Sequence, residues 1–125
     1  MIKRTINIDD YWEVIVYYDI NYNLFHIISE DLAQIGCSKS QIRSIYNNMQ
    51  KGGAKGVTIS SAHCKTSVVL FNAHKSSADY INSIVHEAEH IKQSILDAYD
   101  VKDEGEEPAY TVGYIAMKMM SVLYK

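Results

Sequence analysis

Apolar residues recur along the chain with two spacings, which divide most of it into short strands and longer helices. Three segments rich in β-branched and aromatic residues, 11–20, 56–61 and 66–72, predict strands. The last two are separated only by residues 62–65, a connection short enough for a hairpin. We therefore expect a small sheet that contains at least one antiparallel pair.

Four other segments place apolar residues every three or four positions, as helices with one buried face do. They are 23–35, 39–50, 76–99 and 108–125. The third can be capped by Ser76 or Ser77, and its expected apolar stripe is Ile81, Ile84, Val85, Ala88, Ile91, Ile95 and Leu96. The order of elements predicts an α+β fold, with a small antiparallel or mixed sheet and four main helices, in a single domain over 1–125.

Composition narrows the functional classes. The chain has 125 residues, of which 47% are hydrophobic and 22% charged, with a formal net charge of −3. These values are ordinary for one globular domain, and no basic stripe indicates a nucleic-acid partner. No apolar run approaches the ~20 residues of a membrane span, and the pattern of the first residues leads us to expect no signal peptide. We expect a cytoplasmic protein without a membrane partner.

The sequence HEAEH at 86–90 carries the most specific chemistry. On a helix, His86 and His90 are neighbours on one face, so both imidazoles can bind one metal ion. Glu87 lies beside them, as in the H-E-x-x-H arrangement of zinc hydrolases, where the glutamate takes a proton from metal-bound water. Zinc lowers the pKa of that water to ~7. The sequence therefore predicts a zinc site with Glu87 as general base.

Two histidines are too few for a catalytic zinc, which has three protein ligands and one open position. No histidine follows His90, so a later ligand has to be a carboxylate or a tyrosine. Glu106 and Glu107 begin the next helix, where acids also suit the helix dipole without any metal. A di-iron site built on Glu87-x-x-His90 would need a second such unit, which the chain lacks.

The motif His86-Glu87-x-x-His90 followed by Glu106-x-x-Ala109 resembles the gluzincins, the thermolysin-like zinc peptidases. The segments IVHEAEHI and EEPAYTVGYI are similar to short proteins of this kind carried by phages and mobile elements. The resemblance covers about residues 56–116. It implies a zincin-like core, Zn²⁺ held by His86, His90 and Glu106, and hydrolysis of a protein or peptide substrate, with Glu107 as the alternative third ligand.

Supporting roles are assigned on the same basis. The strand at 66–72 can pair with an extended substrate if it is an exposed edge, and a purely structural strand explains it equally well. A stabiliser of the transition state is also needed; we assign Tyr110 as the catalytic candidate, with Tyr114, His63 and His74 as alternatives. Small residues at Ala109, Gly113 and Ala116 are expected to face the zinc-binding helix.

Two other functions are consistent with the same residues. A catalytically inactive protein of this fold would keep the zinc and serve as a regulatory or interaction module. A metal-free α+β interaction domain would use His86 and His90 as solvated helix residues. Turnover of a peptide separates the first alternative from an enzyme, and the metal content separates the second.

Overall fold

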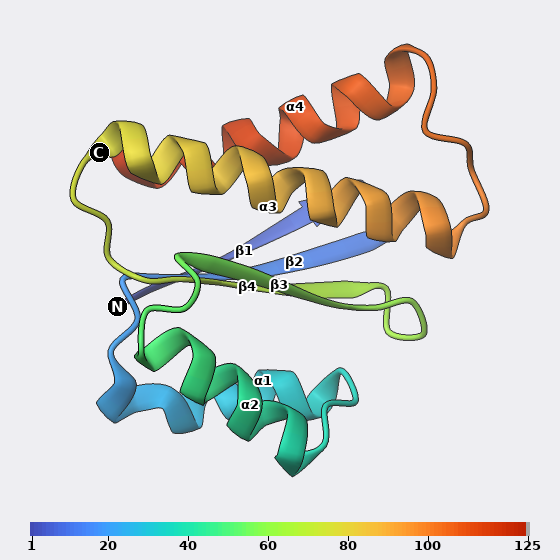
Figure 1. Cartoon of the computed structure of the whole chain (residues 1–125). Helices are drawn as coiled ribbons and strands as arrows, with labels where there is room; N and C mark the ends of the chain where they lie inside the picture. Colours follow the sequence, from blue (N-terminus) through green and yellow to red (C-terminus); the bar gives the residue numbers. More distant parts are fainter. Residues whose placement is uncertain (125) are drawn as a thin grey trace.

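The computed structural model describes residues 1–124, which form a mixed four-stranded sheet between two pairs of helices (Figure 1). The strands are β1 (Ile2–Ile8), β2 (Trp12–Tyr18), β3 (Gly56–Ser61) and β4 (Thr66–Phe71). Their order across the sheet is β1-β2-β4-β3. β1 and β2 are antiparallel, β2 and β4 parallel, and β3 and β4 antiparallel. The expected α+β class, with a mixed sheet and a β3–β4 hairpin, is confirmed.

The strand at 66–72 lies inside the sheet, so of the two alternatives the structural role holds, and pairing with a substrate, which required an exposed edge, is excluded. β4 pairs with β2 on one side and with β3 on the other. All of its residues after Thr66 are buried, whereas every residue of β3 is only half-buried. The edge strand on this side of the sheet is therefore β3, the first strand of the hairpin.

Strand β1 is absent from the sequence prediction. It pairs along its whole length with β2, from Ile2 opposite Tyr18 to Ile8 opposite Trp12. Only Ile6 and Ile8 of this strand are buried. A half-buried edge strand carries a weak hydrophobic pattern, and most of its stability comes from pairing with its neighbour.

The helices cover both faces of the sheet (Figure 1). On one face lie α1 (Phe25–Gln34) and α2 (Lys39–Gln50), and on the other lie α3 (Ser77–Ala98) and α4 (Glu106–Met120). Ser76 caps α3 by accepting a hydrogen bond from the backbone N–H of Asp79. α4 begins two residues earlier than predicted and passes into a short 3₁₀ turn, Ser121–Tyr124. None of the helices described in residues 1–124 has the length and apolarity to cross a membrane.

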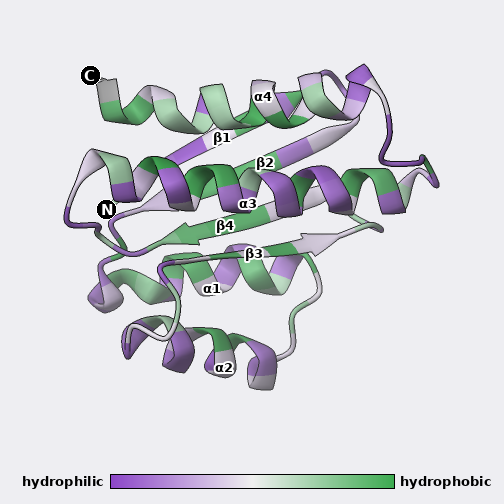
Figure 2. Cartoon of the chain, turned by 45° about the horizontal axis from the view of Figure 1, so that its top comes forward, coloured by the Kyte–Doolittle hydropathy of each residue, from purple (hydrophilic) through white to green (hydrophobic). Residues whose placement is uncertain are grey.

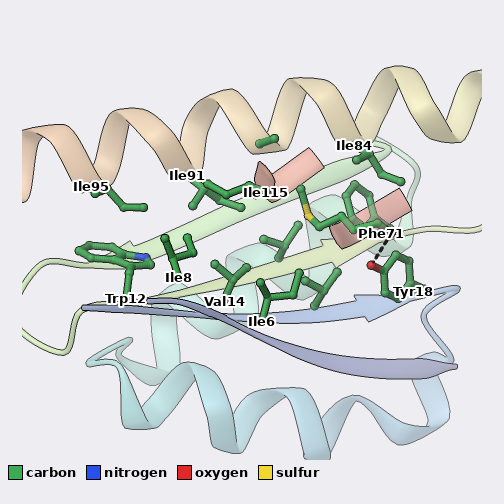
Figure 3. Packing of buried hydrophobic residues seen from close by; sticks show 14 of the residues in the cluster. Ile6, Ile8, Trp12, Val14, Tyr18, Phe71, Ile84, Ile91, Ile95 and Ile115 are labelled. Atoms are coloured by element: carbon green, nitrogen blue, oxygen red, sulfur yellow. Dashed lines mark hydrogen bonds between the residues drawn. The ribbon is translucent and has the colours of Figure 1, made fainter. Parts of the chain in front are cut away.

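The larger hydrophobic core lies between the sheet and the α3–α4 pair (Figure 3). Ile84 and Ile91 of α3 and Ile115 of α4 are fully buried there. The stripe predicted for α3 is wrong at Val85, which is 46% exposed. Glu87 and Lys92 are buried instead, because β3 and α4 flank the helix on its two sides. A smaller core on the opposite face joins α1 and α2 to β2 and β4.

The contrast between Ile84 and Val85 gives a test of this helix orientation. Ile84→Ala should lower the free energy of unfolding by about 2–5 kcal/mol, because it leaves a cavity in the core. Val85→Ala, at the next position of the same helix, should change it by less than ~0.5 kcal/mol. Urea denaturation of the two variants measures both values. Equal losses would mean that α3 is rotated relative to the sheet.

Buried tyrosines make the same core sensitive to alkaline pH. The hydroxyl of Tyr18 donates a hydrogen bond of 2.7 Å to the backbone carbonyl of Met119, drawn in Figure 3 as a dashed line. Burial raises the pKa of Tyr18 to about 12. The folded protein therefore keeps this proton at pH values at which the unfolded chain loses it.

We predict that the free energy of unfolding falls as the pH rises from about 10 to about 12. The fall should be shallower in Tyr18→Phe, which has no phenolic proton at this position. Denaturation at a series of pH values measures the slope. Tyr110→Phe is the control, because Tyr110 is 74% exposed and its removal should leave the slope unchanged. An unaltered slope in Tyr18→Phe would contradict the prediction.

Candidate metal-binding site

His86 and His90 lie side by side on the exposed surface of α3. Their Nε2 atoms are 3.1 Å apart, and their ring centroids are 4.7 Å apart. Two nitrogens bound to one tetrahedral zinc at ~2.0–2.1 Å would be ~3.3 Å apart. The pair therefore has the spacing of two ligands of one ion. Without a metal the same distance suits a hydrogen bond between one protonated and one unprotonated nitrogen.

Glu87 points from the same turn of α3 toward the edge strand β3. Its side chain is buried, with only 4% of the residue exposed, and its Oε1 accepts a hydrogen bond of 2.8 Å from the hydroxyl of Thr58. Among residues 1–124 it is the only buried carboxylic acid. A buried carboxylate is costly unless it is hydrogen-bonded, so Thr58 stabilises it in this position.

Gly56 at the start of β3 permits this close approach of strand and helix. A Cβ atom at this position would lie 3.0 Å from the ring of Phe71 and 3.4 Å from Cγ of Glu87. A larger residue would have to displace one of the two side chains. The absence of a side chain at Gly56 thus leaves space beside Glu87.

That space is a hollow of about 280 Å³ between the start of β3 and α3. It is lined by Ala54, Lys55, Gly56, Asn82, Ser83, His86 and Glu87. One predicted ligand and the predicted general base therefore share a solvent-accessible wall. Thr58 and Lys55 were not singled out from the sequence, because only the packing of β3 against α3 brings them near His86 and Glu87. Asn82 and Ser83 lie one turn before His86 on α3, so helix spacing could have indicated them.

The predicted third ligand is not beside the histidines. α3 continues eight residues past His90 to Ala98, which is ~12 Å along the helix axis, before the chain turns back. Glu106 and Glu107 are exposed at the first turn of α4. Within residues 1–124, no group of three or more His, Cys, Asp or Glu side chains is close enough to hold a metal ion. The structure brings His86 and His90 together without either carboxylate.

A buried lysine holds the connection before α4 on the other side of α3. Nζ of Lys92 lies 2.8 Å from the carboxylate of Asp103 and 2.5 Å from that of Glu89. The hydrogen bonds to Asp103 and Glu89 raise the pKa of Lys92. Successive residues of a helix are rotated by about 100°, so Lys92 and Glu87 lie on different flanks of α3. α4 therefore follows one flank, and β3 with the hollow follows the other.

The candidates for transition-state stabilisation also lie away from the hollow or are engaged in other contacts. Tyr110 and Tyr114, 74% and 40% exposed, lie on the outer side of α4. His63 is in the β3–β4 turn, at the opposite end of β3 from Gly56. His74 is stacked on Tyr80, and both of its ring nitrogens are hydrogen-bonded.

The contacts of His74 explain how it acts on the site indirectly. Its Nδ1 lies 2.6 Å from the carbonyl of Asn72, and its Nε2 lies 2.7 Å from the hydroxyl of Ser83. Ser83 is one of the residues that line the hollow. His74 therefore supports Ser83, which lines the hollow, and both of its ring nitrogens are already hydrogen-bonded.

A scan of protein-family models, a search of curated proteins and a search of solved structures each find no match to this chain. The similarity to gluzincins rests on the motif residues His86, Glu87, His90, Glu106 and Ala109. The function is therefore to be inferred from the geometry around α3 and β3.

The hydrogen bond between Thr58 and Glu87 can be tested by stability. Thr58→Val should lower the free energy of unfolding by about 1–3 kcal/mol, because it leaves a buried carboxylate without its donor. Thr58→Ser, which keeps the hydroxyl, should cost clearly less. Chemical denaturation at neutral pH compares the two variants. If valine is tolerated as well as serine, the carboxylate does not depend on this contact.

Proposed function

We propose that this protein is a zinc-dependent peptidase in which His86 and His90 bind the metal and Glu87 is the general base. The observation that carries the proposal is that the His86–His90 pair lies beside an open hollow that His86 and Glu87 line. The two Nε2 atoms are 3.1 Å apart, and His86 and Glu87 line the same wall. A helix face that only meets water would not need a buried, hydrogen-bonded glutamate beside these histidines.

The donors that are present fit zinc in part. Two imidazole nitrogens at this spacing suit Zn²⁺. A third protein donor is not assembled within residues 1–124. Glu106 remains the proposed third ligand, by its place in the gluzincin-like motif. Its binding would require the start of α4 to leave the position that the contact of Lys92 with Asp103 now holds.

Zinc bound at this position would supply a water molecule of lowered pKa. The protein itself would contribute the carboxylate that accepts the proton of this water molecule. Thr58 occupies Oε1 of Glu87, which leaves Oε2 to accept a proton from water and return it to the leaving amine. Because Thr58 lies on the sheet, the carboxylate is held at a fixed angle relative to the hollow.

The edge strand beside the hollow suits an extended peptide as substrate. β3 pairs with β4 on one side only, so its outer backbone groups are free to bind a further strand. Lys55 and Asn82 line the hollow next to His86, and either side chain can donate a hydrogen bond to a carbonyl oxygen as it becomes negative. This geometry favours them over Tyr110 as stabilisers of the transition state.

A zinc-binding module without catalytic activity is the second candidate. The observation in its favour is that, among residues 1–124, only two donors converge on the site, while both glutamates of α4 lie elsewhere. Such a protein would bind the metal and a peptide along β3 without cleaving it. Hydrolysis of any peptide separates this candidate from the peptidase.

We predict that the protein purified without added zinc contains one zinc per chain and cleaves peptides from a quenched fluorescent library. His86→Ala and His90→Ala should lose the metal and the activity together. Glu87→Gln should keep the metal and lose cleavage, because the amide cannot accept the proton. Elemental analysis and the fluorescence assay measure the two properties.

Asp97→Asn is the matched control, since Asp97 is an exposed acid on the same helix that does not contact Lys92, and should affect neither property strongly. Glu106→Gln and Glu107→Gln form a second matched pair, and the one that weakens zinc binding identifies the third ligand. A wild-type protein free of metal would contradict the proposal. Bound zinc without cleavage would favour the module.

A further inference from the structure

The outer face of α4 is an exposed apolar stripe, which the β1–β2 turn borders on one side at Asp9 and Tyr11. Tyr110, Tyr114 and Met117 are 74%, 40% and 57% exposed, and their spacing places them on one face. α4 lies at the top of the molecule in both Figure 1 and Figure 2, with α3 and the sheet beneath it. Three large side chains in a row on one helix are more than the isolated apolar residues normal for a surface.

Gly113 lies at the middle of the same stretch and has no role inside the chain. A Cβ atom placed there would meet nothing within 4 Å. The expectation that Gly113 faces the histidine-bearing helix is therefore wrong. Glycine weakens a helix relative to alanine, and its usual benefit is the close approach of another backbone. Within residues 1–124 no backbone uses this space.

Two opposite charges flank the stripe. Glu107 and Lys118 are eleven residues apart, which is three helical turns, so they lie along the same flank of α4. Neither forms an ion pair within the described residues 1–124. Nζ of Lys118 lies only over the ring of Tyr114, 5.6 Å from its centroid. The acid is at the beginning of the helix and the base is near its end.

We propose that two copies of this chain associate through α4, packed antiparallel about a two-fold axis beside Gly113. In such a pair, residues on the same flank of the two helices face each other. Glu107 and Lys118 are equally distant from the midpoint between Val112 and Gly113, so each Glu107 lies opposite Lys118 of the second copy. A parallel pair would place these flanks on opposite sides. Charge complementarity therefore selects a second copy in the antiparallel orientation.

This association does not depend on the proposed peptidase activity. His86 and Glu87 face the hollow beside β3, whereas α4 lies along the other flank of α3. The hollow would remain open in the dimer. Loss of zinc or of cleavage would leave the dimer intact, and a monomeric protein could still bind zinc. The two proposals can therefore fail separately.

Sedimentation velocity over a range of protein concentrations tests the association. The wild-type protein should show a concentration-dependent dimer. Lys118→Glu and Glu107→Lys should each weaken it by roughly fivefold or more, because each replaces two attractive contacts by repulsive ones. An equimolar mixture of the two variants should recover the dimer, since every contact in the mixed pair is again between opposite charges.

Apolar variants test the surface itself. Tyr114→Ser combined with Met117→Ser should weaken the dimer at least tenfold, because both side chains would be buried in it. Ile27→Ser is the matched control, since Ile27 is 38% exposed on the opposite face of the sheet. Circular dichroism checks that each variant is folded.

Three outcomes would overturn the proposal. The first is a wild-type protein that stays monomeric at every concentration, which would leave the stripe to a different partner. The second is a dimer unaffected by the serine variants. The third is a mixture of charge variants that does not recover, which would exclude the antiparallel orientation even if the serine variants are too unstable to use.

Discussion

The contact between the carboxylate of Glu87 and the hydroxyl of Thr58 joins one flank of α3 to the edge strand of the sheet. A buried charge needs its hydrogen-bond donor, so rotation of the helix would expose or orphan this carboxylate. Gly56 permits the contact because it leaves the space that Phe71 and Glu87 occupy. With Glu87 turned toward β3, His86 is turned outward to the rim of the same hollow. One polar contact thus helps to place the proposed general base and a proposed metal ligand at the same hollow.

The two flanks of α3 then serve different purposes. β3 lies on the flank of Glu87 and provides a free strand edge beside the histidines. α4 lies on the flank of Lys92, where the ion pair with Asp103 holds its connection. A zinc site with three protein ligands would need a carboxylate from the α4 side of α3 to reach the histidines near the β3 side. The position of the connection before α4 therefore decides between a peptidase and a two-histidine binding site.

The sequence predicted the helices and the hairpin closely because their signals are local. Capping by Ser76, the i, i+4 spacing of His86 and His90, and the short link at 62–65 act between neighbouring residues. Strand β1 was missed because its stability comes from β2, and whether 66–72 is an edge strand stayed open because no single segment encodes the order of strands in a sheet. Val85 was predicted to be in the core because the spacing of apolar residues indicates the buried side of a helix but not where that side ends.

The pairing of the two histidines is therefore a property of the sequence by itself, since any helix through 86–90 brings them together. The neighbours of that pair were decided only by the tertiary structure. Long-range packing brought Thr58, Gly56 and Lys55 to one side of α3. It placed Glu106 and Tyr110, which belong to α4, away from the hollow. The spacing of residues along a helix depends on backbone geometry within one turn. Which side of α3 contacts β3 depends instead on how all the buried side chains pack together in the core.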